Sequence, residues 1–253
     1  MKPLTDDQLL RYARNILLKP VDIAGQERLL SSHVVVVGAG GLGAPLIQYL
    51  AAAGVGTLTI IDDDVVEETN LQRQVIHRLD TVGRLKVDSA AEFITGLNPD
   101  VRVQSYAQRL TAENISTLIP RVDLVVIGTD NFASRYLVSD FCAEHKIPLV
   151  TGAAIGTSGQ VTSFDFKHQA SPCFRCLYED GEDDNLTCAT AGVLGPVVGT
   201  IGSVMAMEVI KILLSIGQPL FQRLMTWDAL SMEWQTFTYQ TSQQCPACQK
   251  RSL

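Results

Sequence analysis

The chain has 253 residues, of which 46% are hydrophobic, and its 27 acidic and 20 basic residues give a net charge of -7. This balance leaves no basic surface of the kind that nucleic acid or an anionic membrane attracts, so we expect neither as a partner. The first residues, MKPLTDDQLL, lack the basic and then apolar stretch of a secretory signal. We therefore expect a cytoplasmic protein, with one domain that spans residues 1–253.

The first βαβ unit is expected in HVVVVGAGGLGAPLIQYLAAAGVGTLTIIDDD, which predicts a strand, a glycine turn, a helix and a second strand. Gly38, Gly40 and Gly43 permit the sharp turn, close phosphate approach and tight helix packing of a nucleotide-binding turn. Asp62 closes the second strand, where an acidic residue typically binds ribose hydroxyls. These features predict a nucleotide, but they fit a nicotinamide dehydrogenase equally well.

Further strands and helices alternate along the next part of the chain. Strands are expected in VRVQSY at 101, DLVVIGTD at 123 and IPLVTGA at 147, and helices around 85–97, 111–119 and 132–145. This alternation predicts an α/β fold with a doubly wound, Rossmann-like and mostly parallel sheet. QVTSFDF at 160 and MEWQTFTY at 232 alternate like half-exposed strands, which predicts an antiparallel C-terminal portion.

The longest apolar stretch covers residues 191–216 and predicts a buried helix. Glu208 and Lys211 lie inside it, and a Gly-Pro pair at 195–196 interrupts it, which argues against a membrane span. Four glycines fall at helical spacing within a narrow arc, at 192, 195, 199 and 202. They fit either tight packing within one subunit or contact with a twin subunit or an extended peptide, and periodicity favours neither.

The segment NLQRQVIHRLDTVGRLKVD separates two kinds of nucleotide. It supplies Asn70, Arg73 and Lys86 just after Asp62, and clustered cations indicate additional phosphates rather than a neutral nicotinamide ring. A triphosphate is the simplest ligand. Asp130, at the end of the strand predicted at 123, is a candidate magnesium ligand at the same edge of the sheet. His77 is interpreted as a structural residue.

Four of the six cysteines form two C-x-x-C pairs, and the two pairs are separated by 68 residues. Two such turns complete the closed four-sulfur shell that zinc prefers, so Cys173, Cys176, Cys245 and Cys248 predict a structural zinc site. That site would attach the C-terminal segment to the domain. The alternative is one redox-active pair and an unrelated tail. Cys142, in an apolar helix, is expected in the core.

Several motifs, taken in chain order, resemble the MoeB/ThiF/HesA family of ubiquitin-activating-enzyme-like adenylyltransferases over nearly the whole chain. They are RYARNILL, GAGGLG, NLQRQ, GRLKVD, TDN, TCATAGVLGPVVGTIGS and the two cysteine pairs. TGAAI followed by SGQVTSF, together with the LTC segment, is most similar to the molybdopterin-synthase adenylyltransferases. The resemblance implies ATP- and Mg²⁺-dependent adenylation of the C-terminal glycine of a ubiquitin-like sulfur-carrier protein ending in Gly-Gly. The implied carrier is the small subunit of molybdopterin synthase, or alternatively the thiamine-pathway carrier.

The resemblance also implies roles for individual residues. Arg73, Lys86 and Asp130 would act at the phosphates and magnesium, and Arg14 would reach the active site of the opposite subunit in a homodimer. The four paired cysteines match the zinc ligands of the family. The full nucleotide-binding set is Gly38, Gly40, Gly41, Gly43, Asp62, Thr69, Asn70, Leu71, Gln72, Arg73, Lys86, Asp130 and Asn131.

Two places leave the function open. Cys188 matches a cysteine that forms a covalent link to the carrier in some relatives, and local charges do not settle whether it does so here. After GAAI the chain reads GTSG, where relatives often have arginine or another large residue. We expect no rhodanese-like segment after Leu253, and therefore a separate sulfur-donor protein. A nicotinamide-dependent oxidoreductase and a non-catalytic zinc-bearing binding module are the alternatives of other classes.

Overall fold

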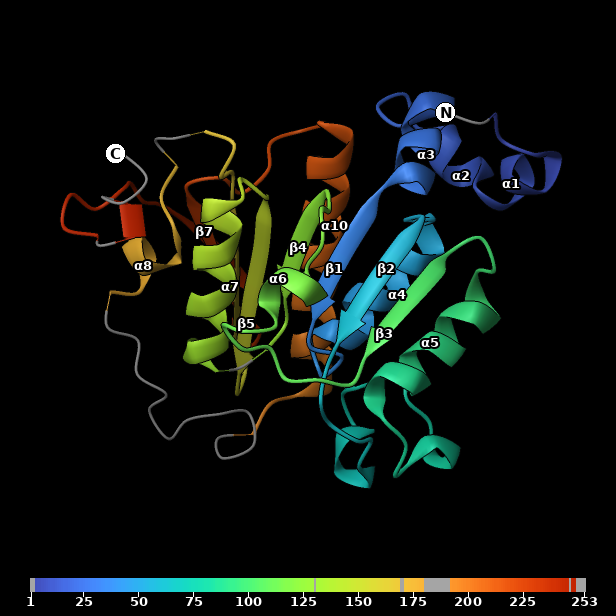
Figure 1. Ribbon diagram of the computed structural model, residues 1–253, viewed down its shortest axis with the longest axis horizontal. Coiled ribbons are helices and arrows are strands. Elements are labelled where there is room, and N and C mark those ends of the chain that lie inside the picture. Colours follow the sequence, from blue (N-terminus) through green and yellow to red (C-terminus); the bar gives the residue numbers. More distant parts are fainter. Residues whose placement is uncertain (1–2, 130, 169–170, 180–191, 246, 249–253) are drawn as a thin grey trace.

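The computed structural model describes residues 3–129, 131–168, 171–179, 192–245 and 247–248 (Figure 1). Asp130 and Cys188, two of the predicted functional residues, lie outside this part of the chain. The α-helices are α1 Asp6–Arg11, α2 Ala13–Ile16, α3 Asp22–Ser31, α4 Gly43–Ala53, α5 Lys86–Leu97, α6 Ile115–Leu118, α7 Phe132–Glu144, α8 Phe174–Leu177 and α10 Gly195–Leu214. The strands are β1 His33–Val37, β2 Thr57–Ile61, β3 Arg102–Tyr106, β4 Leu124–Ile127, β5 Leu149–Ile155, β6 Ser158–Phe164, β7 Arg223–Asp228 and β8 Glu233–Thr238.

The strands form one eight-stranded sheet in the order β3-β2-β1-β4-β5-β6-β7-β8. The pairs from β3 to β5 are parallel, and those from β5 to β8 are antiparallel. The predicted fold class is therefore confirmed. The predicted strands at 160 and 232 do not pair with each other, because β7 lies between them. The sequence analysis missed β7, whose segment RLMTWD does not alternate between apolar and polar residues.

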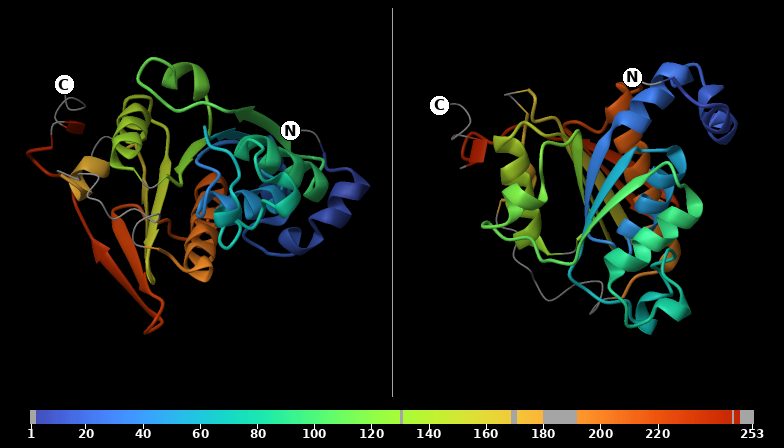
Figure 2. Two further views of the ribbon diagram at one scale, coloured as in Figure 1. Left: turned by 90° about the horizontal axis from the view of Figure 1, so that it is seen from below. Right: turned by 45° about the vertical axis from the view of Figure 1, so that its right-hand side comes forward.

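Helices cover both faces of the parallel part of the sheet (Figure 2). Successive valines of β1 point to opposite faces, so Val34 and Val36 join one buried cluster while Val35 and Val37 join another. The first cluster contains the inner faces of α4, α5 and α10, and the second contains those of α6 and α7. Burial on both faces explains why β1 is a continuous apolar run.

Helix α10 is a core helix. By length and composition it is the one helix in the described residues that is able to cross a membrane, but it packs against α4, β5 and β6. Glu208 is only 2% exposed, and its carboxylate accepts hydrogen bonds from the Ser163 hydroxyl at 3.1 Å and the Leu220 N–H at 2.7 Å. Lys211 pairs with the same carboxylate. A buried, fully paired charge fits a protein interior.

The four glycines predicted at helical spacing do not all lie on one face of α10. Gly192 precedes α10 and has φ +73°, so it does not belong to the helix face. A Cβ at Gly195 would lie 2.5 Å from the carbonyl oxygen of Gln72, and one at Gly202 would lie 2.6 Å from that of Leu42. These two glycines therefore serve packing within the subunit. A Cβ at Gly199 would meet no described atom within 4 Å.

Candidate functional site

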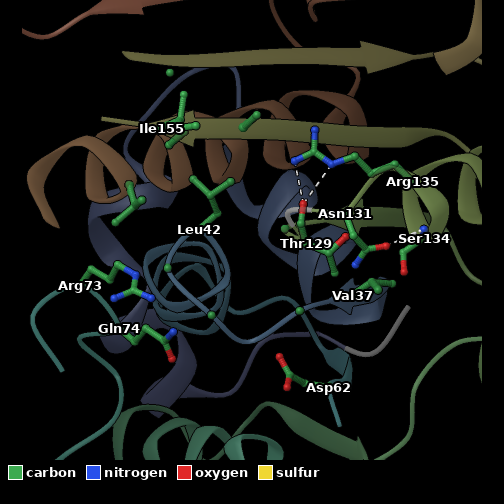
Figure 3. A pocket seen from close by; sticks show the side chains of 18 of the residues that line it. Val37, Leu42, Asp62, Arg73, Gln74, Thr129, Asn131, Ser134, Arg135 and Ile155 are labelled. Carbon is green, nitrogen blue, oxygen red and sulfur yellow. Dashed lines mark hydrogen bonds between the residues drawn. The ribbon is translucent and has the colours of Figure 1, made fainter. Parts of the chain in front are cut away.

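A cavity of about 940 Å³ opens at the carboxyl ends of the parallel strands (Figure 3). Val37 of β1, Ile61 of β2 and Gly128 after β4 contribute to its wall. The chain leaves β1 toward β2 on one side, whereas β4 and β5 follow on the other, so the cavity lies at the switch point of the sheet. Open α/β sheets characteristically bind ligands at this position.

The glycine turn forms the floor of this cavity. Gly38 has φ +97°, a left-handed conformation that glycine adopts without strain. A Cβ at Gly43 would lie 2.1 Å from the carbonyl oxygen of Gly38, so no larger residue fits there. Gly40 and Gly41 line the cavity itself. A phosphate group can therefore closely approach the backbone of Gly40 and Gly41, which leads into the N-terminus of α4.

Asp62 is fixed beside the glycine turn by backbone groups. Its Oδ2 accepts a hydrogen bond from the Ala39 N–H at 2.7 Å, and its Oδ1 accepts one from the Asp64 N–H at 2.9 Å. Burial raises the pKa of Asp62, while the positive charge of Lys86 and the two N–H groups oppose that shift. Each carboxylate oxygen accepts one of these bonds and retains a second lone pair, which suits ribose hydroxyls.

Beyond Asp62, the cavity wall contains two cationic side chains, Arg73 and Lys86, and the amide of Asn70. Lys86, whose side chain is 8% exposed, places Nζ 2.6 Å from Oδ2 of Asp64. Arg73 lies in the cavity wall and donates from Nη1 to the Thr69 carbonyl at 3.2 Å. Asn70 is buried in the same wall. The structure thus brings Asn70, Arg73 and Lys86 together, and it adds Asp64 as a partner that the sequence analysis did not identify.

The other predicted nucleotide residues differ in their positions. Asn131 lines the cavity and caps α7, accepting a hydrogen bond from the Ser134 N–H at 2.8 Å. Thr69, Leu71 and Gln72 do not line the cavity, although the Thr69 carbonyl holds Arg73. Arg14 is exposed on α2 and does not line it either.

Two polar residues of the cavity wall were missed by the sequence analysis (Figure 3). Gln74 is 3% exposed, and its Oε1 has no hydrogen-bond partner in the described part of the chain. Arg135 is 5% exposed and donates to the Thr129 carbonyl at 2.7 and 3.0 Å and to the Gly152 carbonyl at 3.0 Å. Gln74 is the last residue of the NLQRQ motif, and Arg135 lies shortly after the TDN motif.

The cavity extends from the glycine turn to the antiparallel strands. Ile155 and Ser158 line it at either side of the turn that carries the GTSG difference. Strands β6, β7 and β8 add polar side chains to the wall, namely Gln160, Thr226, Asp228, Glu233 and Gln235, together with Trp227. Small-molecule sites commonly enclose about 300 to 1,000 Å³, so this cavity lies at the upper end of that range.

The four paired cysteines meet at the second apolar cluster, which also contains buried residues of α7. Their sulfur atoms all lie within 4.8 Å of one another, and individual Sγ–Sγ distances are 3.4, 3.5, 3.6 and 3.9 Å. A tetrahedral zinc with Zn–S of about 2.3 Å requires about 3.8 Å between sulfurs. The cluster fits zinc and not the bond length of about 2.05 Å that a disulfide has. Cys142 is fully buried, as predicted, and burial raises the pKa of its thiol.

The chain matches the model of the ThiF family over residues 12–247. It is 42% identical over 248 residues to the molybdopterin-synthase adenylyltransferase of Escherichia coli, covering 98% of this chain and 99% of the relative. It is 39% identical to the sulfur carrier protein ThiS adenylyltransferase of the same organism, covering 97% of each. The SAMP-activating enzyme E1 of Haloferax volcanii is 49% identical, with 95% of this chain and 89% of the relative covered.

Solved structures agree with the fold. Escherichia coli MccB in its complex with ATP superposes with a TM-score of 0.81 over 94% of this chain and 73% of that chain, at 22% sequence identity. At this identity the likeness supports the Rossmann-like architecture alone.

Proposed function

Since the chain belongs to the ThiF family, we propose that it uses ATP to adenylate the C-terminal carboxylate of a ubiquitin-like sulfur-carrier protein. Two of the relatives named above are adenylyltransferases by name, one for molybdopterin synthase and one for the sulfur carrier protein ThiS. The observation that carries the proposal is the cavity in which the glycine turn, Asp62, Arg73 and Lys86 converge. A nicotinamide dinucleotide carries only a diphosphate, and its nicotinamide ring would offer no further anionic partner to those cations.

The proposed reaction requires charge neutralisation more than proton transfer. A C-terminal carboxylate is ionised at pH 7, so it attacks the α-phosphorus without a general base. The new bond joins a carboxylate oxygen to the α-phosphorus, while the bond to the bridging oxygen breaks and pyrophosphate leaves. Arg73 and Lys86 would offset the charge on the phosphates, and the glycine turn would hold them in line.

The phosphates of ATP would compete with Asp64 for the ammonium group of Lys86. In the structure its ammonium group pairs with Asp64, whose side chain is 65% exposed. We propose that Asp64 keeps the buried ammonium in place until ATP binds. An exposed carboxylate in high dielectric holds a cation weakly, so a polyphosphate is able to replace it.

Magnesium and zinc have separate roles in the proposal. We propose Asp130 as the magnesium ligand because it is the acidic residue of the TDN motif. Asp130 itself lies outside the described residues. Magnesium, when bound, would neutralise phosphate charge. Zinc would be held by Cys173, Cys176, Cys245 and Cys248, where four ligands leave no open position, and would stabilise the fold.

The space beyond the nucleotide supports a peptide substrate. The wall built by β6, β7 and β8 offers hydroxyl, amide and carboxylate groups to an extended chain. A narrow tail ending in Gly-Gly would present its carboxylate beside the glycine turn. We propose the small subunit of molybdopterin synthase as the carrier, with the thiamine-pathway carrier as the alternative. A separate protein would donate sulfur in the cytoplasm.

We further propose a homodimer with composite sites. Arg14 is exposed and lies outside the cavity of its own subunit, as a residue that serves a second copy would. Large apolar side chains close to it in the sequence are exposed as well, namely Leu10 at 79%, Leu17 at 71% and Leu18 at 56%. Contact with another copy would cover such a patch.

ATP–pyrophosphate exchange tests the proposed function. Purified, zinc-loaded protein should exchange labelled pyrophosphate into ATP only when a Gly-Gly-tailed carrier is present. A nicotinamide oxidoreductase would instead change the cofactor absorbance without ATP. A non-catalytic binding module would bind the carrier and show no exchange.

A further inference from the structure

His77 is a buried histidine outside the cavity that touches two parts of the nucleotide site at once. It is 5% exposed and follows the NLQRQ segment. Its Nε2 lies 3.0 Å from the carbonyl oxygen of Ala39, in the glycine turn. Its Nδ1 lies 2.9 Å from the hydroxyl of Ser89, on α5. His77 therefore bridges the glycine turn and the helix that begins with Lys86.

The contact with Ala39 fixes the protonation pattern of the ring. A carbonyl oxygen only accepts, so Nε2 must carry the proton that it donates to Ala39. Burial lowers the pKa of His77, and the charge of Lys86 lowers it further, while the Ala39 carbonyl opposes both. The ring is therefore neutral at pH 7. In this tautomer Nδ1 accepts, so the single proton of the Ser89 hydroxyl points to the ring and not to Thr81, whose own proton goes to the Arg78 carbonyl at 2.8 Å.

The Ala39 residue is held from both ends. Its N–H donates to Asp62 at 2.7 Å, and its carbonyl accepts from His77 at 3.0 Å. That carbonyl shares a planar trans peptide with the N–H of Gly40, so the two groups point in opposite directions. Holding the carbonyl toward His77 turns the Gly40 N–H away from it. Gly40 lines the cavity, whereas His77 does not.

The contact with Ser89 connects the same ring to Lys86. Ser89 lies three residues after Lys86 in α5, so both side chains share one face of the helix. The Ser89 hydroxyl also lies 3.2 Å from that of Thr81, in the turn before α5. A shift of the imidazole would thus be transmitted to the glycine turn and to the start of α5 together.

We propose that His77 is a positioning residue for the nucleotide. The ring orients the Gly40 N–H toward the phosphates and fixes the distance between that N–H and Lys86. It acts through the Ala39 carbonyl and Ser89 and does not touch the ligand. The inference rests on the proposed function only in taking ATP as the ligand. Arg73 and Lys86 would supply positive charge, and His77 would orient the uncharged donor, the Gly40 N–H.

Three variants separate this role from ordinary packing. His77→Leu removes both hydrogen bonds, and His77→Gln keeps an amide N–H near the position of Nε2. His77→Asn places its amide near Nδ1 and leaves nothing near Nε2. His33→Leu is the control, because it also replaces a histidine by leucine and loses a hydrogen bond, to Thr59 at 2.8 Å, at the far end of β1 from the cavity.

The measurement is the Kd for ATP by calorimetry without carrier, followed by KM and kcat in the exchange assay. Loss of the buried hydrogen bond to the Ala39 carbonyl, which both variants share, predicts a Kd and KM about tenfold higher for His77→Leu and His77→Asn, with kcat within about threefold of wild type. His77→Gln should retain a Kd within about threefold of wild type. His33→Leu should lower the melting temperature and leave the Kd unchanged.

Several results would overturn the inference. A folded His77→Leu protein with the Kd of wild type would show that the ring does not position the nucleotide. Equal losses in the Gln and Asn variants would show that the Nε2 contact is not responsible, and this comparison stands even if the Leu variant fails to fold. Wild-type protein that binds no ATP would overturn the proposed function as well.

Discussion

Arg73 illustrates how a single residue supports the assignment of the site. It lies in the cavity wall, and its guanidinium is held by the Thr69 carbonyl, so it is oriented before any ligand arrives. Oriented cations stabilise developing charge without reorganisation, which is the main requirement of the proposed phosphoryl chemistry. Arg84 has the same charge nearby in the sequence, but it pairs with Glu92 at 2.7 Å and does not line the cavity.

We expect Arg73→Ala to lower the exchange rate about 100-fold or more, because it removes one charge-stabilising donor. Circular dichroism and zinc content should remain unchanged. Arg84→Ala is the matched control, since it removes an exposed ion pair worth about 1 kcal/mol or less, and it should exchange at close to the wild-type rate. Equal rates in both variants would remove Arg73 from the active site.

At the scale of elements, the cysteine cluster joins two distant segments of the chain. Cys173 immediately precedes α8 and Cys176 lies within it, whereas Cys245 and Cys248 lie beyond β8. A metal held by both pairs would fasten the C-terminal segment to the second apolar cluster, which contains Cys173, Cys245 and Cys248. Metal binding and folding are coupled in such sites.

We expect Cys245→Ser to release zinc and to lower the melting temperature, since three thiolates hold the metal less tightly than four. Cys142→Ala is the control, because it also removes a fully buried thiol of the second apolar cluster but is not one of the four grouped sulfurs. It should lower the melting temperature and keep one zinc per chain. Metal analysis of both proteins decides between a zinc site and unrelated cysteine pairs.

Helix α10 offers a second test, in which two glycines of the same face have opposite expectations. Gly202→Ala should destabilise the fold by roughly 1 to 3 kcal/mol, because its Cβ would overlap with Pro45 and the Leu42 carbonyl. Gly199→Ala has open space and should stabilise the helix by about 0.5 to 1 kcal/mol. Urea unfolding measures both. A loss of dimer on Gly199→Ala would instead place a second copy against that glycine.

At the scale of the whole molecule, much of the fold could be predicted from the residues. Glycine positions and apolar runs located β1, α4 and β2 because their constraints are local and strong. β7 was missed because RLMTWD becomes a strand only through pairing with β6 and β8, which its own pattern does not encode. In the site, Gln74 and Arg135 were missed because their residue types do not distinguish them. Only the tertiary structure shows that both are buried in the cavity wall.

The composite active sites that we propose for a homodimer predict complementation between two inactive variants. In a mixed dimer of Arg14→Ala and Arg73→Ala chains, one of the two sites contains both intact arginines. Random mixing makes about half of the dimers mixed, so about a quarter of wild-type exchange should return from two inactive proteins. Unmixed variants are the controls. Complete inactivity after mixing and subunit exchange would contradict the role of Arg14 across the dimer.

ATP–pyrophosphate exchange with the molybdopterin-type carrier, the thiamine-type carrier and no carrier tests the central claim most directly. We predict exchange that requires a Gly-Gly-tailed carrier and is greater with the molybdopterin-type protein. Preference for the thiamine-type carrier would keep the reaction and change the pathway. Folded, zinc-loaded protein that shows no exchange with either carrier would contradict the proposed adenylation.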